Sequence, residues 1–111
     1  MQIETKKMEG VTVLHVKGNL DADSVASFKK TAYKLVEEGC HRLVLDCSHL
    51  DFVDSMGLGA MISLLRRVRT HKGDLKVAGL NQEVRSVFEI TRLHHLFEIS
   101  NDSKTAVERF Q

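Results

Sequence analysis

The sequence contains no proline, no tryptophan and only two cysteines. Without a proline-, glycine- or serine-rich stretch, a chain of 111 residues offers no linker between two domains, so we expect residues 1–111 to form one domain. Cys40 and Cys47 are too few for a disulfide framework and are not spaced as a CxxC redox pair. We therefore expect a reducing, cytoplasmic location, with Cys47 as a buried thiol.

Two further absences narrow the function. No apolar run approaches the roughly 20 residues that span a bilayer, and residues 1–7 lack the apolar stretch of a signal peptide, so we expect no association with a membrane. The formal net charge is +1 and aromatic residues make up 5% of the chain. A nucleic-acid-binding domain usually has a basic surface, often with aromatic residues that stack on bases, so we expect no direct contact with nucleic acid.

The sequence does contain a regular alternation of short apolar runs and amphipathic segments. Strands are predicted near residues 2–8, 11–16, 42–47, 75–80 and 96–99. Helices are predicted from Asp21 or Asp23 to Gly39, from near Leu58 to Gly73, from Asn81 past Phe88, and from Asp102 or Ser103 onward. This order predicts an α/β fold with a four- to five-stranded, mostly parallel sheet, an antiparallel edge hairpin and about four helices.

Residues 54–59, Asp-Ser-Met-Gly-Leu-Gly, join the third predicted strand to the second predicted helix. Such loops lie at the carboxyl ends of parallel strands, where α/β folds usually place their sites. Ser55 is expected at or next to the helix N-cap, where its hydroxyl could serve as a structural cap or as a reactive group. Gly57 and Gly59 each cost a helix about 1 kcal/mol relative to alanine. They permit either tight packing of the helix on the sheet or close approach of a partner.

This stretch resembles the signature of STAS domains, named for sulfate transporters and anti-sigma factor antagonists. In the soluble antagonists the loop reads Asp-Ser-(Ser/Thr/Ala)-Gly-Leu-Gly, so Met56 replaces a small residue here. The likeness continues in Gly18-Asn19-Leu20-Asp21, in Leu43-Val44-Leu45-Asp46, and in the segment from Val84 to Leu93. It therefore covers nearly the whole chain, and we expect a single STAS domain over residues 1–111.

The resemblance implies a binding switch and not an enzyme. The unphosphorylated protein would bind an anti-sigma factor that is also a serine kinase of the GHKL type, and would thereby release a sigma factor. Phosphorylation of Ser55 would abolish this binding, and a metal-dependent serine phosphatase would restore it. Asp21 would lie beside the phosphoacceptor and face a basic group of the kinase. The full expected partner-binding set is Asp21, Asp23, Asp54, Met56, Gly57 and Gly59, with no cofactor, no metal and a monomer when free.

Other classes fit the residues less well. An esterase elbow, G-x-S-x-G, would need glycine at Val53. A dinucleotide fingerprint would need a third glycine at Ile62, although direct nucleotide binding by the first helical turn stays open. His94-His95, with His41, His49 and His71, lack the spacing of a zinc site. A STAS subunit of another signalling or lipid-transport complex is the alternative within the same family.

Overall fold

The computed structural model describes all 111 residues. Four helices and five strands alternate along the chain, as the apolar pattern predicts. They are β1 (Gln2–Met8), β2 (Val11–Leu20), α1 (Val25–Glu37), β3 (Arg42–Val53), α2 (Ser55–Thr70), β4 (Asp74–Ala78), α3 (Gln82–Ile90), the 3-10 turn η1 (Leu93–His95), β5 (Ile99–Ser100) and α4 (Ser103–Glu108). None of the helices combines the length and apolar character that a membrane crossing needs.

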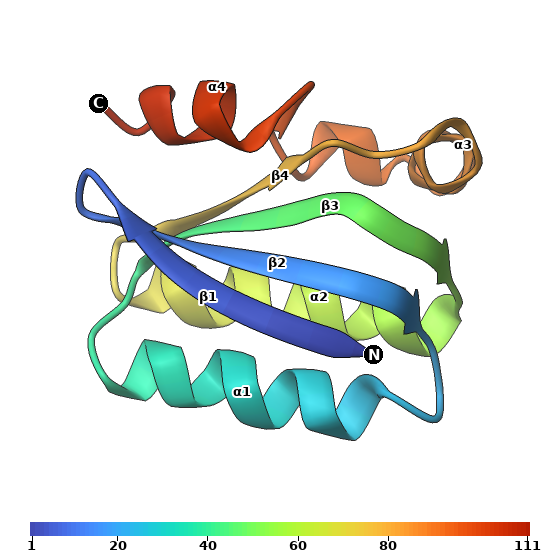
Figure 1. Ribbon diagram of the computed structural model, residues 1–111, viewed down its shortest axis with the longest axis horizontal. Helices are drawn as coiled ribbons and strands as arrows, with labels where there is room; N and C mark the ends of the chain where they lie inside the picture. Colours follow the sequence, from blue (N-terminus) through green and yellow to red (C-terminus); the bar gives the residue numbers. More distant parts are fainter.

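The strands form one sheet in chain order, β1-β2-β3-β4-β5 (Figure 1). β1 pairs with β2 antiparallel, and every other pair is parallel. The two-residue turn between β1 and β2 places both Glu9 and Gly10 at positive φ, the geometry that tight hairpins favour. The predicted mostly parallel sheet with an antiparallel edge hairpin is confirmed.

Four strands differ from the prediction in their bounds, and the smallest change is in β4, which covers Asp74–Ala78 instead of residues 75–80. β2 continues to Leu20 instead of ending near Val16, and β3 continues to Val53 instead of Cys47. The extra residues pair with one another across two register shifts, so Gly18 and Asn19 do not break the strand. β5 begins only at Ile99, because the chain before it forms the 3-10 turn η1 and a further turn at Leu96. The long ends of β2 and β3 carry the loop before α2 to one end of the molecule.

Both faces of the sheet are covered. α1 and α2 pack on one face, and α4 lies over the other (Figure 1). Leu14 and Val16 of β2 belong to the large core beneath α1 and α2, whereas Val11 and Val13 belong to a smaller cluster beneath α4. This two-sided burial explains why β2 is apolar at nearly every position. Cys47 is fully buried, as expected, and burial raises the pKa of its thiol.

Candidate functional site

Ser55 is the first residue of α2, and its side chain is exposed. It follows β3 at the carboxyl end of the parallel strands, where β2 also ends (Figure 1). The predicted strand-to-helix position of Ser55 is therefore confirmed. Only Asp54 separates Ser55 from the end of the sheet, and this fixes the direction in which the helix begins.

The helix cap is Asp54 and not Ser55. The Oδ1 atom of Asp54 accepts a hydrogen bond from the Gly57 N–H at 2.9 Å, and its carbonyl accepts one from the Leu58 N–H at 2.9 Å. No hydrogen bond within the chain involves the Ser55 hydroxyl. The alternative in which Ser55 serves as the structural cap is thus wrong, and its hydroxyl is free to react.

Asp54 also joins two loops. Its Oδ2 atom accepts from the Ala22 N–H at 3.1 Å, and its own N–H donates to the Leu20 carbonyl at 3.2 Å. Both carboxylate oxygens are therefore occupied within the chain. Asp54, expected in the partner surface, holds the loop after β2 against the start of α2.

Asp21 organises the turn that leads into α1. Its Oδ1 atom accepts from the N–H groups of Asp23 at 3.1 Å and Ser24 at 3.2 Å, the pattern of an N-cap. The regular helix begins later, at Val25, and the side chain of Ser24 does not cap it. The Oδ2 atom of Asp21 makes no hydrogen bond within the chain, so the same carboxylate also has an oxygen available to a partner.

The two glycines of the loop have different surroundings. A Cβ atom on Gly57 would overlap the carbonyl oxygen of Leu20 and lie 2.8 Å from Cγ2 of Val53. Gly57 is buried, and it allows α2 to pack closely on the end of β2. Gly59 is exposed, and a Cβ atom there would meet nothing within 4 Å. Nothing in the folded chain therefore requires glycine at position 59.

Two large apolar side chains near Ser55 are exposed to solvent. Met56 is 54% exposed and Phe52 is 52% exposed, whereas Leu58 is only 9% exposed and belongs to the core. The expectation that Met56 faces away from the core is confirmed. Phe52 was not predicted, because a strand ending near Cys47 gives no indication of which way residue 52 points. Both side chains lie within three residues of Ser55 in the sequence and are available for contact with a partner.

Carboxylates surround this end of the molecule without balancing cations. None of the five ion pairs of the protein involves Asp21, Asp23, Asp51 or Asp54. Asp23 and Asp51 are exposed, and Asp21 and Asp54 are half-buried. The surface around Ser55 is therefore acidic before any modification.

The histidines do not gather at this site. His41 stacks on His71 with ring centroids 4.1 Å apart, and His94 lies against His95 at 4.0 Å. The remaining candidate, His49, contacts the Ser48 hydroxyl through Nδ1 at 3.2 Å. No three His, Cys, Asp or Glu side chains lie together as a metal site would require.

Nearly the whole chain is similar to proteins that are already known. The STAS domain family model matches residues 2–106. BtrV of Bordetella bronchiseptica, provisionally named an anti-sigma factor antagonist, is 26% identical over 111 residues, which cover all of this chain and 96% of that protein. The anti-sigma-B factor antagonist of Bacillus subtilis is 25% identical over 97% of this chain and 98% of its own. A solved Thermotoga maritima protein, also provisionally named an anti-sigma factor antagonist, superposes with a TM-score of 0.92 at 22% identity, covering 96% of this chain and 92% of its own.

Proposed function

Because this chain belongs to the STAS domain family, we propose that it acts as an anti-sigma factor antagonist whose binding is abolished when Ser55 is phosphorylated. One observation carries the proposal: Ser55 is exposed at the start of α2 with an unbonded hydroxyl, while Asp54 performs the capping. The names of the relatives support an anti-sigma factor as the class of partner. The protein itself catalyses no step in this scheme.

A phosphate on Ser55 is compatible with the fold. Asp54 satisfies the N–H groups of Gly57 and Leu58, which leaves the N–H groups of Ser55 and Met56 at the helix start, where a helix has no carbonyls of its own to offer. These groups and the dipole of the 16-residue helix favour an anion. Phosphorylation should therefore change the surface of the domain and leave its packing intact.

The same phosphate should weaken binding of the partner, because it adds negative charge to a surface of this protein that is already acidic. Phosphorylation adds about −1.5 to −2 charges beside carboxylates that have no cationic partner. Two unit charges about 4 Å apart at an effective dielectric of about 20 interact by roughly 4 kcal/mol. A hundredfold loss of affinity needs only about 2.8 kcal/mol. Repulsion between the phosphate and the neighbouring carboxylates, strengthened when a docking partner excludes water from them, is therefore sufficient for a switch.

The proposed contact surface combines apolar and acidic groups. Met56 and Phe52 offer exposed apolar area, and Gly59 leaves room for close approach of a partner backbone. The free oxygen of Asp21 would receive a basic group of the partner, and Asp23 would add to the acidic rim. We propose a GHKL-type serine kinase as the partner, a metal-dependent phosphatase that reverses the modification, and a monomeric free state.

The test begins with the protein isolated together with its partner from the native lysate. Wild-type protein should retain a serine kinase, and Ser55→Asp protein should lose it. With ATP, the recovered kinase should phosphorylate wild-type protein at Ser55 alone, and Ser55→Ala protein not at all, as read by mass spectrometry.

Ser48→Ala provides the matched control, because Ser48 is also exposed but its hydroxyl contacts His49. This variant should be phosphorylated like the wild type. Stoichiometric phosphorylation of Ser55→Ala protein would refute the assignment of the phosphoacceptor. A partner retained equally by wild-type and Ser55→Asp protein would refute the switch and favour a constitutive subunit of another complex.

A further inference from the structure

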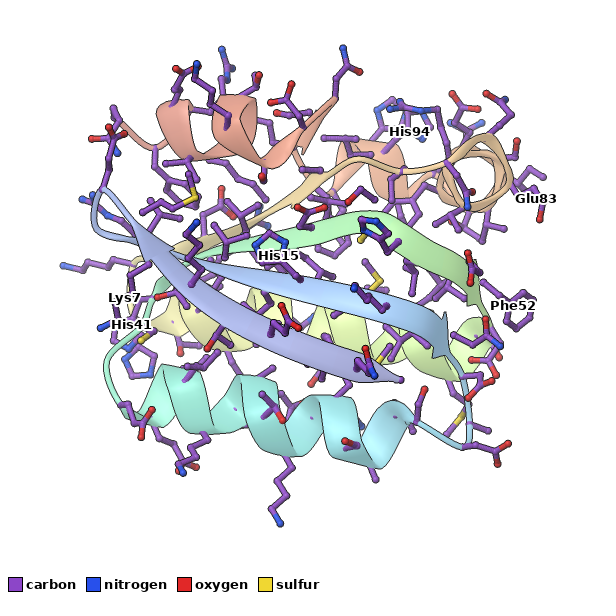
Figure 2. All side chains as sticks on the ribbon, in the orientation of Figure 1. Lys7, His15, His41, Phe52, Glu83 and His94 are labelled. Atoms are coloured by element: carbon purple, nitrogen blue, oxygen red, sulfur yellow. The ribbon has the colours of Figure 1, made fainter.

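A hollow of about 450 Å³ lies at the end of the sheet opposite Ser55. Its walls come from the β1–β2 hairpin, the start of β3, and the loops that follow α1 and α2. Figure 2 shows Lys7 and His41 together at this end, with Phe52 at the other. The side chains with polar or charged groups on its lining are Lys7, Thr12, His41, Arg42, His71 and Lys72, together with the Cys40 thiol.

The hollow is basic although the chain is nearly neutral. Lys7, Arg42 and Lys72 are exposed, and none of them forms an ion pair. No aspartate or glutamate lines the hollow. The carboxylate of Asp74, which follows the lining residue Gly73, pairs with Arg69 and Lys76. Three positive charges from three separate segments therefore line one space that no acidic side chain lines.

The C-terminal ends of α1 and α2 lie at this hollow and disfavour an anion, since each helix C-terminus carries a partial charge of about −0.5. One carbonyl in the last turn of each helix nevertheless already accepts hydrogen bonds. The Val36 carbonyl accepts from the Gly39 N–H at 3.0 Å and contacts Nε2 of His41 at 3.1 Å, and the Val68 carbonyl accepts from the Gly73 N–H at 2.8 Å. Two half charges do not offset three full positive charges, so the hollow stays attractive to anions.

The walls are held in place before any ligand arrives. A Cβ atom on Gly73 would overlap the His41 carbonyl, and that carbonyl accepts from the Asp74 N–H at 3.0 Å. The two loops are thereby fixed together, and the His41 and His71 rings stack with an interplanar angle of 12°. Thr12 as a whole is only 5% exposed, but its hydroxyl makes no hydrogen bond within the chain and is not among the buried polar atoms, so it keeps contact with solvent. A solvent-accessible hydroxyl on the lining, without a partner in the chain, can donate to an oxygen ligand.

We propose that this hollow binds a small phosphate-bearing ligand independently of the state of Ser55. Its volume lies within the roughly 300–1,000 Å³ that small-molecule sites occupy. The Arg42 guanidinium offers the planar fork that suits phosphate oxygens, and the two lysines add point charges. The Thr12 hydroxyl supplies a neutral donor from the sheet.

Inorganic pyrophosphate is a suitable probe, titrated into the isotope-labelled protein at near-physiological salt and followed by amide chemical shifts. We expect saturable shifts at Thr12, His41, Arg42 and Lys72, unchanged in Ser55→Asp protein. Arg42→Gln and Lys72→Gln should each weaken binding at least about tenfold, or about 1.4 kcal/mol. Thr12→Val should weaken it while its melting temperature shows that the domain still folds.

Lys30→Gln is the matched control, because Lys30 is an exposed, unpaired lysine on α1 outside the hollow. It should bind pyrophosphate like the wild type. The proposal would be overturned if Lys30→Gln lost as much affinity for pyrophosphate as the variants in the hollow. It would also be overturned if the chemical-shift changes centred on Ser55 and Met56, or if they did not saturate. Tighter binding of a short DNA oligonucleotide than of pyrophosphate at the same residues would also overturn it, because the ligand would then be a nucleic acid.

Discussion

The Asp54 carboxylate accepts a hydrogen bond from the backbone N–H of Ala22, which lies 32 residues earlier in the chain. The other oxygen of this carboxylate caps α2 through the Gly57 N–H. One side chain thus fixes α2, which begins with Ser55, to the loop that carries Asp21. The site around Ser55 depends on this connection for its shape.

Asp54→Ala should therefore destabilise the protein by about 1–3 kcal/mol, since it removes a helix cap and a second hydrogen bond together. Denaturant unfolding measures the change. Asp51→Ala is the control, because Asp51 is exposed in the same region and should alter stability by less than about 0.5 kcal/mol. An Asp54→Ala protein as stable as wild type would show that the loop connection contributes nothing.

The helices and most strands were predictable because their signals are local. The apolar spacing of α1 and α2, and the caps Asn81 and Asp102, can be read within a few residues of the chain. The cap of α2 could not be chosen in this way, since Asp54 and Ser55 are both good N-cap residues. The choice depends on the Asp54 N–H pairing with Leu20, a contact between distant segments.

The same reason explains what the sequence did not reveal. Gly18 and Asn19 are typical of a turn, yet they extend β2 because β3 lies beside them. Phe52 lies in the corresponding extension of β3, and its exposure could not be predicted without that extension. The basic hollow is assembled from segments around Lys7, Arg42 and Lys72, and only the tertiary fold brings these cations together. Recognition of the loop motif indicated the Ser55 site, whereas no motif marked the hollow.

Glu98 makes stability depend on pH. Hydrogen bonds from Arg109 at 2.8 Å and from Lys76 at 2.7 Å lower the pKa of its carboxyl group from 4.5 to about 2. The unfolded chain therefore takes up this proton at a higher pH than the folded chain does. The stabilisation from Glu98 is fully present above about pH 4.5 and is lost as the pH falls toward 2.

Glu98→Gln should flatten this part of the stability profile, measured by urea unfolding at several pH values between neutral pH and about 2. Glu108→Gln is the control, since Glu108 is exposed and forms no ion pair. It should retain the wild-type slope. Identical slopes in wild-type and Glu98→Gln protein would show that the ion-paired cluster does not control stability in acid.

Met56 and Leu58 should separate binding from folding. Met56→Ala should change stability by less than about 0.5 kcal/mol, because the side chain is 54% exposed, but should weaken the partner complex by about 1 kcal/mol or more. Leu58→Ala should cost about 2–5 kcal/mol of stability, because Leu58 lies in the core. Unfolding and affinity measurements on both variants decide the matter. A loss of stability in Met56→Ala with unchanged affinity would place the contact surface elsewhere.

Gly57 and Gly59 allow a matched test, because replacing each glycine with alanine should change the stability of the fold in opposite directions. Gly57→Ala should destabilise by about 1–3 kcal/mol, since the added methyl group would overlap the Leu20 carbonyl and force α2 away from β2. Gly59→Ala should stabilise by up to about 1 kcal/mol, since the methyl group enters open space and alanine favours the helix. Thermal or denaturant unfolding measures both changes.

The affinity of Gly59→Ala for the partner shows why glycine is present there. If Gly59 admits a partner backbone, the more stable variant should bind the anti-sigma factor at least about tenfold more weakly, which corresponds to about 1.4 kcal/mol. Gly59→Ser places a larger side chain at the same position and should weaken binding further. A Gly59→Ala protein that is both more stable and fully competent to bind would remove Gly59 from the contact surface, leaving Met56 and Phe52 as its exposed apolar part.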